Sequence, residues 1–187
     1  MIWACIGTSS PVASVALFED DAVLESDYRH APTGASGAAL EILQQMNVGL
    51  DEIDLFSADL GPGSFTGVKV GVVLAKTLAY CFKKPAAGFT SFDLISPEAT
   101  AAVPSRKGSC LLRAPGQAPL EVSADDPRLA SALGYGPAFG EQTYPLAENA
   151  ARLFESINAV DPVVLVPNYV LEPSISKPKQ PFGRAPE

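Results

Sequence analysis

The chain has 187 residues, of which 47% are hydrophobic and 18% are charged, so it is long and apolar enough to fold as one domain or two small lobes. Its formal net charge of −8 excludes a protein that grips a nucleic-acid backbone alone, because such binding is built from Lys and Arg contacts. Its three cysteines, Cys5, Cys81 and Cys110, form no Cys-x-x-Cys pair, which favours buried free thiols in a reducing cytoplasm over a disulfide or zinc framework.

Three short apolar runs open the chain and predict an antiparallel meander. They lie at 2–6, 12–18 and 22–28, and tight turns rich in Gly, Ser, Pro and Asp separate them. A helix over 37–46 follows, because its apolar residues recur at helical spacing. We expect these elements to begin a mixed α/β lobe.

A strand, a long helix and another strand complete this first lobe. The strand at 55–60 ends in a glycine-rich loop, and the helix over 65–82 follows it directly. A second strand is predicted at 85–89, and Thr90-Ser91 is suited to cap a short helix over 92–95.

Beyond Pro97 the composition changes, since most of the 17 prolines lie there. Short strands are predicted at 101–103 and 109–113, and a helix at 147–157. We therefore divide the chain into an N-terminal α/β lobe at 1–97, a small degenerate C-terminal lobe at 98–172 and a proline-rich tail at 173–187.

The glycine loop at 61–67 is the first segment that could carry chemistry. It joins a strand to a helix N-terminus, where free N–H groups can cradle an anion. A tight turn without a ligand explains the same glycines and is the favoured interpretation. The spacing is also wrong for a phosphate-binding P-loop, because Thr66 stands where the second glycine belongs.

Small residues form a row on the helix that follows this loop. Gly67, Gly71, Ala75 and Ala79 are four residues apart and share one helix face. Glycine in a helix interior costs about 1 kcal/mol relative to alanine, so close approach by another backbone should offset that cost. Either a foreign helix packs there or the helix is fully internal.

Catalytic and metal-binding residue types are scarce. His30 is the only histidine, which excludes a two-histidine metal site within the chain. The carboxylates Asp51, Glu52 and Asp54 are typical of a solvated turn, and Asp125-Asp126-Pro127 indicates a helix start. We predict no catalytic residue, no metal and no cofactor.

Membrane insertion and export are not indicated either. No stretch approaches the roughly 20 uncharged apolar residues of a membrane span, and no basic segment precedes the first apolar run. We expect a cytoplasmic protein with no membrane partner.

The glycine loop and the start of the next helix resemble the TsaB (YeaZ) family. The matching residues are Gly61-Pro62-Gly63-Ser64-Phe65-Thr66-Gly67, followed by Val68-Lys69-Val70-Gly71. The resemblance covers the first half of the chain, and Pro167-Asn168-Tyr169-Val170 is similar to the family's C-terminal Pro-x-Tyr-Leu signature. It implies an α/β fold of the actin/hexokinase/Hsp70 type (ribonuclease H-like), which is duplicated and here has a reduced second lobe.

The resemblance further implies a function in synthesis of N6-threonylcarbamoyladenosine (t6A) in tRNA. Family members are non-catalytic scaffolds for the catalytic paralogue TsaD, the ATPase TsaE joins the complex, and members alone form homodimers. The two helices of the first lobe pack as a bundle in these assemblies. Carried onto this chain, the interface residues are Ile42, Leu43, Met46, Gly67, Gly71, Ala75, Leu78 and Ala79.

The chain departs from the family pattern in its first turn and near its C-terminus. Gly7-Thr8-Ser9 replaces the usual Asp-Thr-Ser, which removes the obvious Mg²⁺-side carboxylate of a nucleotide site. Leu171 stands where the signature often has Arg. Two alternatives to the scaffold remain open: a nucleotide-binding enzyme using the loop at 61–67, and a diverged homodimer without a tRNA role.

Overall fold

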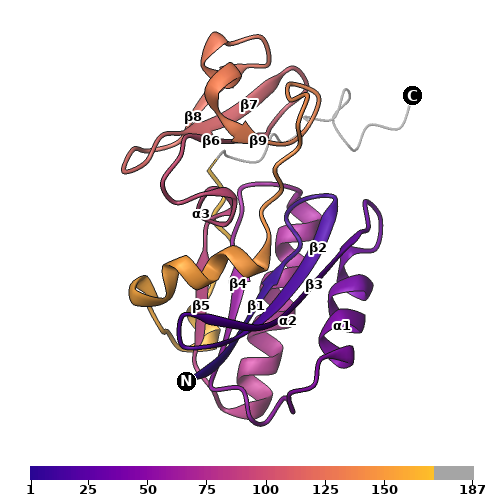
Figure 1. The fold of residues 1–187 in the computed structure, drawn as a ribbon. Coiled ribbons are helices and arrows are strands. Elements are labelled where there is room, and N and C mark those ends of the chain that lie inside the picture. The colour runs from indigo at the N-terminus through magenta and orange to yellow at the C-terminus, as the bar shows by residue number, and fades with distance from the viewer. Residues whose placement is uncertain (171–187) are drawn as a thin grey trace, which may run out of the picture.

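The computed structural model describes residues 1–170, which form two β-sheets, one in each of two lobes (Figure 1). The predicted tail at 173–187 and the departure at Leu171 lie outside the described residues. The chain enters the second lobe through 90–100 and returns to the first through 135–146. After residue 165 it leads back toward the second lobe, where Val170 packs against that lobe's core.

The first sheet has five strands in the order β3-β2-β1-β4-β5. They are β1 (Ile2–Gly7), β2 (Val12–Glu19), β3 (Ala22–His30), β4 (Leu55–Asp59) and β5 (Ala86–Phe89). β2 is antiparallel to both β1 and β3, which confirms the predicted meander. β1, β4 and β5 run parallel, so the carboxyl ends of three strands meet at one edge.

Two helices cover one face of this sheet, α1 (Ala35–Gln45) and α2 (Phe65–Phe82). α1 begins two residues earlier than predicted, after Gly34 in a left-handed conformation with φ 95°. α2 has the predicted bounds, and the side chain of Ser64 caps it. It is the one helix within residues 1–170 that is long and apolar enough to cross a membrane, yet one side of it packs in the core.

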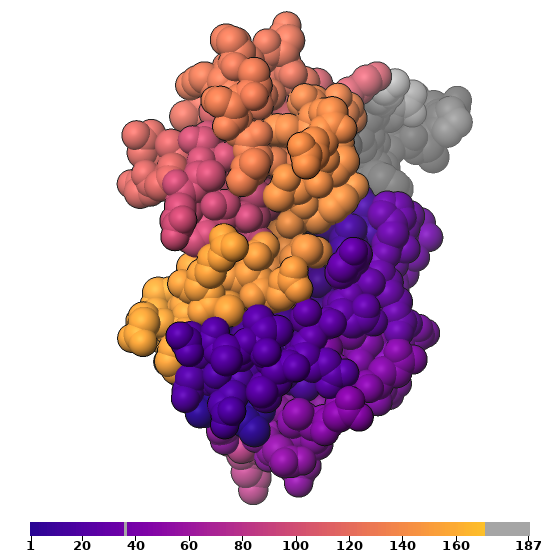
Figure 2. All heavy atoms as spheres, in the orientation of Figure 1, coloured from indigo at the N-terminus to yellow at the C-terminus, as the bar shows by residue number. Residues whose placement is uncertain are grey.

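A segment from late in the sequence covers the opposite face. Residues Ala147–Ser156 form the 3₁₀ helix η2, which packs against Trp3 and Phe18, whose rings stack 4.0 Å apart. The chain then bridges β5 through Val160 and continues into η3 (Pro162–Val164). Figure 2 shows the orange and yellow spheres of this returning segment against the indigo strands.

This return corrects the predicted domain division. Residues 147–165, which we assigned to the second lobe, pack on the first sheet, and Leu165 belongs to the same core cluster as α1 and α2. The helix expected at 147–157 is present, but it belongs to the first lobe. This helix packs on strands that are distant in sequence, and the periodicity of its own residues does not reveal which strands they are.

The second lobe is a small sheet in the order β8-β7-β6-β9. Its strands are β6 (Ala101–Pro104), β7 (Ser109–Arg113), β8 (Leu120–Ser123) and β9 (Leu133–Gly134), with the 3₁₀ helix η1 (Pro127–Ser131) before β9. The strands expected at 101–103 and 109–113 are confirmed. The short helix α3 (Ser91–Ile95), capped by Thr90 as expected, leads from the first lobe into this sheet.

The cysteines differ from expectation at one position. All three are free, and Cys5 and Cys110 are buried as predicted. Cys81 is exposed on α2, so the prediction of three buried thiols is wrong there.

Candidate functional site

The glycine loop packs tightly onto the turn between β1 and β2. A Cβ atom at Gly63 would lie 2.3 Å from the carbonyl oxygen of Ser9, and one at Gly67 would lie 2.0 Å from that of Thr8. Real Cβ atoms do not come this close, so only glycine fits at either position. The glycines therefore allow close packing within the chain, in agreement with the favoured interpretation of a tight turn without a ligand.

Several N–H groups of this loop already have acceptors inside the protein. The Ser64 N–H donates to the Ser9 carbonyl at 2.7 Å, and the Gly67 N–H donates to Ser64 Oγ at 3.2 Å. The Gly61 N–H donates to Asp59 Oδ1 at 2.8 Å. A phosphate cradle would need these donors directed at the ligand, so the loop is poorly suited to bind an anion.

The row of small residues on α2 faces the protein's own sheet. A Cβ atom at Gly71 would meet Thr8 Oγ1 at 2.4 Å, and Ala75 and Ala79 are completely buried in the core. The expectation that this row receives a foreign helix is wrong, because β1 and the turn after it already occupy that space. Gly67 and Gly71 let the turn after β1 approach α2 closely, and this contact within the chain offsets the cost of two glycines in a helix.

The other proposed interface residues are also largely internal. Ile42 and Leu43 on α1 and Met46, its C-cap, are buried in the same core, and Leu78 on α2 is half-buried against it. The two helices do pack together, but these side chains form the inside of the pair. A docking partner would have to meet other residues of the same helices.

A different apolar face of the helix pair is open to solvent. Val73 is 59% exposed and Leu40 is 39% exposed. They line a shallow groove with a volume of about 390 Å³, whose walls are Leu40, Lys69, Val70, Val73, Leu74 and Thr77. We call these six residues the α1–α2 groove. Sequence spacing indicated a helix apolar on more than one side but did not identify which side stays open.

A buried carboxylate lies beneath the glycine loop, and the sequence analysis missed it. Asp59 is the last residue of β4 and is completely buried. Ser91 Oγ donates to its Oδ1 at 2.6 Å, and Ser9 Oγ contacts its Oδ2. Burial is the main cause that raises the pKa of Asp59, to about 6. The signal in the sequence was a charged residue, Asp59, at the end of the apolar strand β4.

The cluster lies where open α/β sheets commonly bind ligands, at the carboxyl ends of parallel strands. Ser9 follows β1, Asp59 ends β4 and Ser91 follows β5. Here, however, the three side chains satisfy one another, and each is at most 1% exposed. The site is closed by its own hydrogen bonds and offers no free carboxylate to a substrate.

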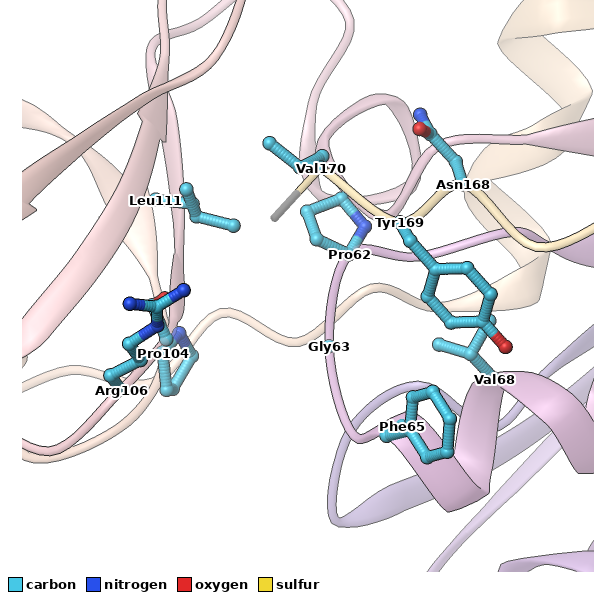
Figure 3. Close-up of a pocket in the computed structure, with 11 residues that line it drawn as sticks. Pro62, Gly63, Phe65, Val68, Pro104, Arg106, Leu111, Asn168, Tyr169 and Val170 are labelled. Atoms are coloured by element: carbon cyan, nitrogen blue, oxygen red, sulfur yellow. The ribbon is translucent and has the colours of Figure 1, made fainter. Parts of the chain in front are cut away.

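A cleft of about 210 Å³ lies between the lobes beside the glycine loop (Figure 3). Phe65 and Tyr169 line one side with ring centroids 5.3 Å apart, and Arg106 and Leu111 from the second lobe line the other. The Asn168 N–H donates to the Leu60 carbonyl at 2.8 Å, which fixes the segment at 167–170 beside the loop.

The remaining polar residues singled out from sequence are not gathered into a site. His30 is exposed at the end of β3, and Asp54 pairs with Lys84 at 3.4 Å. Glu52 accepts the Gly49 N–H in a local turn. Within residues 1–170, no group of three His, Cys, Asp or Glu side chains has the arrangement of a metal site.

Comparison with known proteins points to one group of tRNA-modification proteins. A family model described as "TsaD: tRNA N6-adenosine threonylcarbamoyltransferase" matches residues 33–111. The chain is 31% identical over 98 residues to the tRNA threonylcarbamoyladenosine biosynthesis protein TsaB of Bacillus subtilis, covering 49% of this chain and 42% of that protein. It is 48% identical over 40 residues to TsaB of Haemophilus influenzae, covering 21% and 17%.

The solved structures agree with these relatives in fold. YeaZ from Pseudomonas aeruginosa superposes with a TM-score of 0.73 at 18% identity, covering 90% of this chain and 99% of that one. The chain is similar to TsaB proteins in sequence, to TsaD over residues 33–111, and to YeaZ in fold. The predicted fold class, the actin/hexokinase/Hsp70-like α/β fold, is confirmed. The chain spans less than half the length of the curated relatives that it matches.

In this TsaB-like chain, Gly7 occupies the position where the resemblance led us to expect a carboxylate. A Cβ atom at Gly7 would lie 2.7 Å from Ser14 Oγ. Ser14 Oγ in turn accepts the N–H of Ala147, the first residue of η2, at 2.9 Å. Gly7 therefore leaves room for the hydrogen bond between Ser14 and Ala147, which fixes the start of η2 on the first sheet.

The cap of α2 gives a first prediction for this TsaB-like protein. Ser64→Ala should lower the free energy of unfolding by about 1 kcal/mol, because the Gly67 N–H loses its side-chain acceptor. Thr66→Ala, at an exposed position of the same helix turn, is the control and should change stability by less than half as much. Urea denaturation measures both variants, and equal losses would contradict a capping role for Ser64.

Proposed function

We propose that the chain is a non-catalytic scaffold subunit that supports t6A synthesis in tRNA by docking on a TsaD-like catalytic partner. The main support is the match to the TsaD family model over residues 33–111, which contain α1, the glycine loop and α2. This is also the segment that carries the exposed α1–α2 groove. Similarity to two proteins named for threonylcarbamoyladenosine biosynthesis favours the same pathway.

The α1–α2 groove supports docking through an apolar helix face. α2 has no acidic residue, and Lys69 lines the groove, whereas Lys76 donates to the carbonyl oxygens of Val163 and Leu165. An apolar strip with a positive charge at its rim is complementary to a partner surface that is apolar and flanked by acidic side chains. The proposed contact residues are therefore Leu40, Val70, Val73 and Leu74, with Lys69 at the rim, in place of the buried row.

The closed Asp59 cluster and the tightly packed glycine loop support a role without catalysis. Catalysis in this family would then fall to the TsaD-like partner, and a TsaE-like ATPase would join through the complex. The same features disfavour the alternative of a nucleotide-binding enzyme. Titration of the full chain with ATP and Mg²⁺ should give neither heat nor a thermal shift. A saturable signal at micromolar ATP would support the enzyme instead.

Nucleoside analysis of tRNA tests the pathway. Deleting the gene from its native cell should remove t6A from the tRNA pool, and expression of the full chain should restore it. Unchanged t6A after deletion would contradict the proposal and would favour the remaining alternative, a diverged homodimer without a tRNA role.

A charge placed in the α1–α2 groove tests the docking mode. Val73→Glu should weaken binding to the TsaD-like partner at least about tenfold, since a carboxylate would be buried in an apolar contact. Leu24→Glu is the matched control, because Leu24 is a similarly exposed residue on β3 (48%), away from the groove. Both variants should keep the wild-type melting temperature. Equal affinity of the two variants for the partner would show that the groove is not the contact.

A further inference from the structure

Ser9, Asp59 and Ser91 form a closed ring of oxygen atoms. Ser9 Oγ contacts Asp59 Oδ2, Ser91 Oγ lies 2.6 Å from Asp59 Oδ1, and the two serine oxygens lie 3.0 Å apart. All three residues are buried away from bulk solvent, where polar groups form their hydrogen bonds mainly within the protein. The three contacts must be satisfied by the protons that these groups carry.

Counting protons shows what the ring requires. Three oxygen–oxygen hydrogen bonds need three protons, and each serine hydroxyl supplies one. The third contact has a proton only when Asp59 is a neutral carboxylic acid. The ring then runs in one direction, with Asp59 donating to Ser91, Ser91 to Ser9, and Ser9 back to Asp59. When Asp59 is ionised, both serines donate to the carboxylate, and the contact between Ser9 and Ser91 is left without a proton.

The ring also lies at the junction of the two lobes. Ser91 is the first residue of α3, the segment through which the chain enters the second lobe. From the second lobe, the Tyr135 hydroxyl donates to the backbone carbonyl oxygen of Ser9 at 3.5 Å. Asp59 Oδ1 accepts the Gly61 N–H, which connects the glycine loop to the same cluster.

We propose that Ser9, Asp59 and Ser91 act as a proton-linked latch between the lobes: a proton on Asp59 closes the ring, and its loss opens the serine–serine contact and loosens the packing of Tyr135. This inference concerns the fold of the chain and does not depend on the proposed function.

The groups around Asp59 favour a proton on it at weakly acidic pH. Burial raises its pKa to about 6, and the negative field of Asp93 on α3 adds to the rise, whereas Ser9, Ser91 and Gly61 oppose it as hydrogen-bond donors. Asp93 itself pairs with Arg113 of β7 at 2.5 Å. The other titratable neighbours are the Cys5 thiol of β1 and the Tyr135 hydroxyl; burial raises both of their pKa values, so neither is charged in this range.

Carbon-detected NMR of the full chain between pH 4 and 8 tests the latch. With ¹³C-labelled aspartate, the Asp59 carboxyl signal should titrate with a midpoint near pH 6, and Asp59→Asn assigns it by its disappearance. The Tyr135 ring signals should shift with the same midpoint. In Ser91→Ala the ring is open at every pH, so Asp59 should still titrate while the Tyr135 response is lost.

Two results would overturn the latch. One is an Asp59 midpoint near pH 4, which would show that the ring does not hold a proton. The other is a Tyr135 signal that stays constant through the Asp59 titration, or that follows it unchanged in Ser91→Ala. The wild-type titration requires no variant, so poor folding of Asp59→Asn would not prevent the test.

Discussion

Replacing Gly67 with alanine should lower the free energy of unfolding by about 3 kcal/mol, and the variant should be the least stable single-methyl change in the first lobe. The new Cβ would lie 2.0 Å from the Thr8 carbonyl oxygen, which belongs to backbone and cannot rotate away. Relief requires α2 to move off the turn after β1, and such overpacking typically costs 1–3 kcal/mol or more. Urea denaturation followed by fluorescence of the buried Trp3 measures the loss.

Gly37→Ala is the matched control, because it adds the same methyl group to a helix. No atom lies within 4 Å of the Cβ that Gly37 would gain on α1. The substitution should be neutral or stabilise the fold by up to about 1 kcal/mol, through the higher helix propensity of alanine. If Gly67→Ala and Gly37→Ala behaved alike, α2 would not be packed against the β1–β2 turn as described.

Stability should fall as the pH rises through the range in which Asp59 ionises. Its folded-state pKa is raised from 3.8 to about 6, so the folded protein holds this proton more tightly than the unfolded chain does. The stabilisation is therefore fully present below about pH 4 and is lost as the pH rises to about 6. A shift of about two pKa units, at 1.36 kcal/mol each, corresponds to a loss of about 3 kcal/mol.

Denaturation of Asp59→Asn over the same pH range isolates this contribution. The asparagine does not ionise, so most of the fall of about 3 kcal/mol in the free energy of unfolding between pH 4 and 6 should be absent in this variant. Asp126→Asn is the control: Arg128 lowers the pKa of Asp126 to about 2, so its stabilisation disappears only as the pH falls through that value. Asp126→Asn should keep the wild-type dependence between pH 4 and 6. A wild-type curve that is flat in this range would contradict an ionisable buried Asp59.

Local signals in the sequence predicted most of the first lobe. The meander, α2 and the caps Ser64 and Thr90 follow from short-range patterns, and the structure confirms them. In the second lobe, Asp126 caps η1 at the predicted helix start. Two strands of the second lobe were missed, because only one of the four residues of β8 is buried and β9 has only two residues. Such short segments show too little alternation to be recognised.

The remaining differences arise from contacts between residues distant in sequence. η2 packs on strands more than 120 positions earlier, and Asp59 meets Ser9 across 50 residues and Ser91 across 32. The small residues of α2 were detected correctly but assigned to the wrong neighbour. Their spacing shows that a backbone approaches closely, and it does not tell whether that backbone belongs to β1 or to another protein.

Hydrogen–deuterium exchange of the full chain, alone and with its TsaD-like partner from the native cell, tests the docking proposal most directly. Binding through the α1–α2 groove predicts slower exchange in Ala35–Gln45 and Phe65–Phe82, with β3 and the second sheet unchanged. Absence of any complex at micromolar concentrations, or protection confined to β3 or to β6–β9, would contradict it.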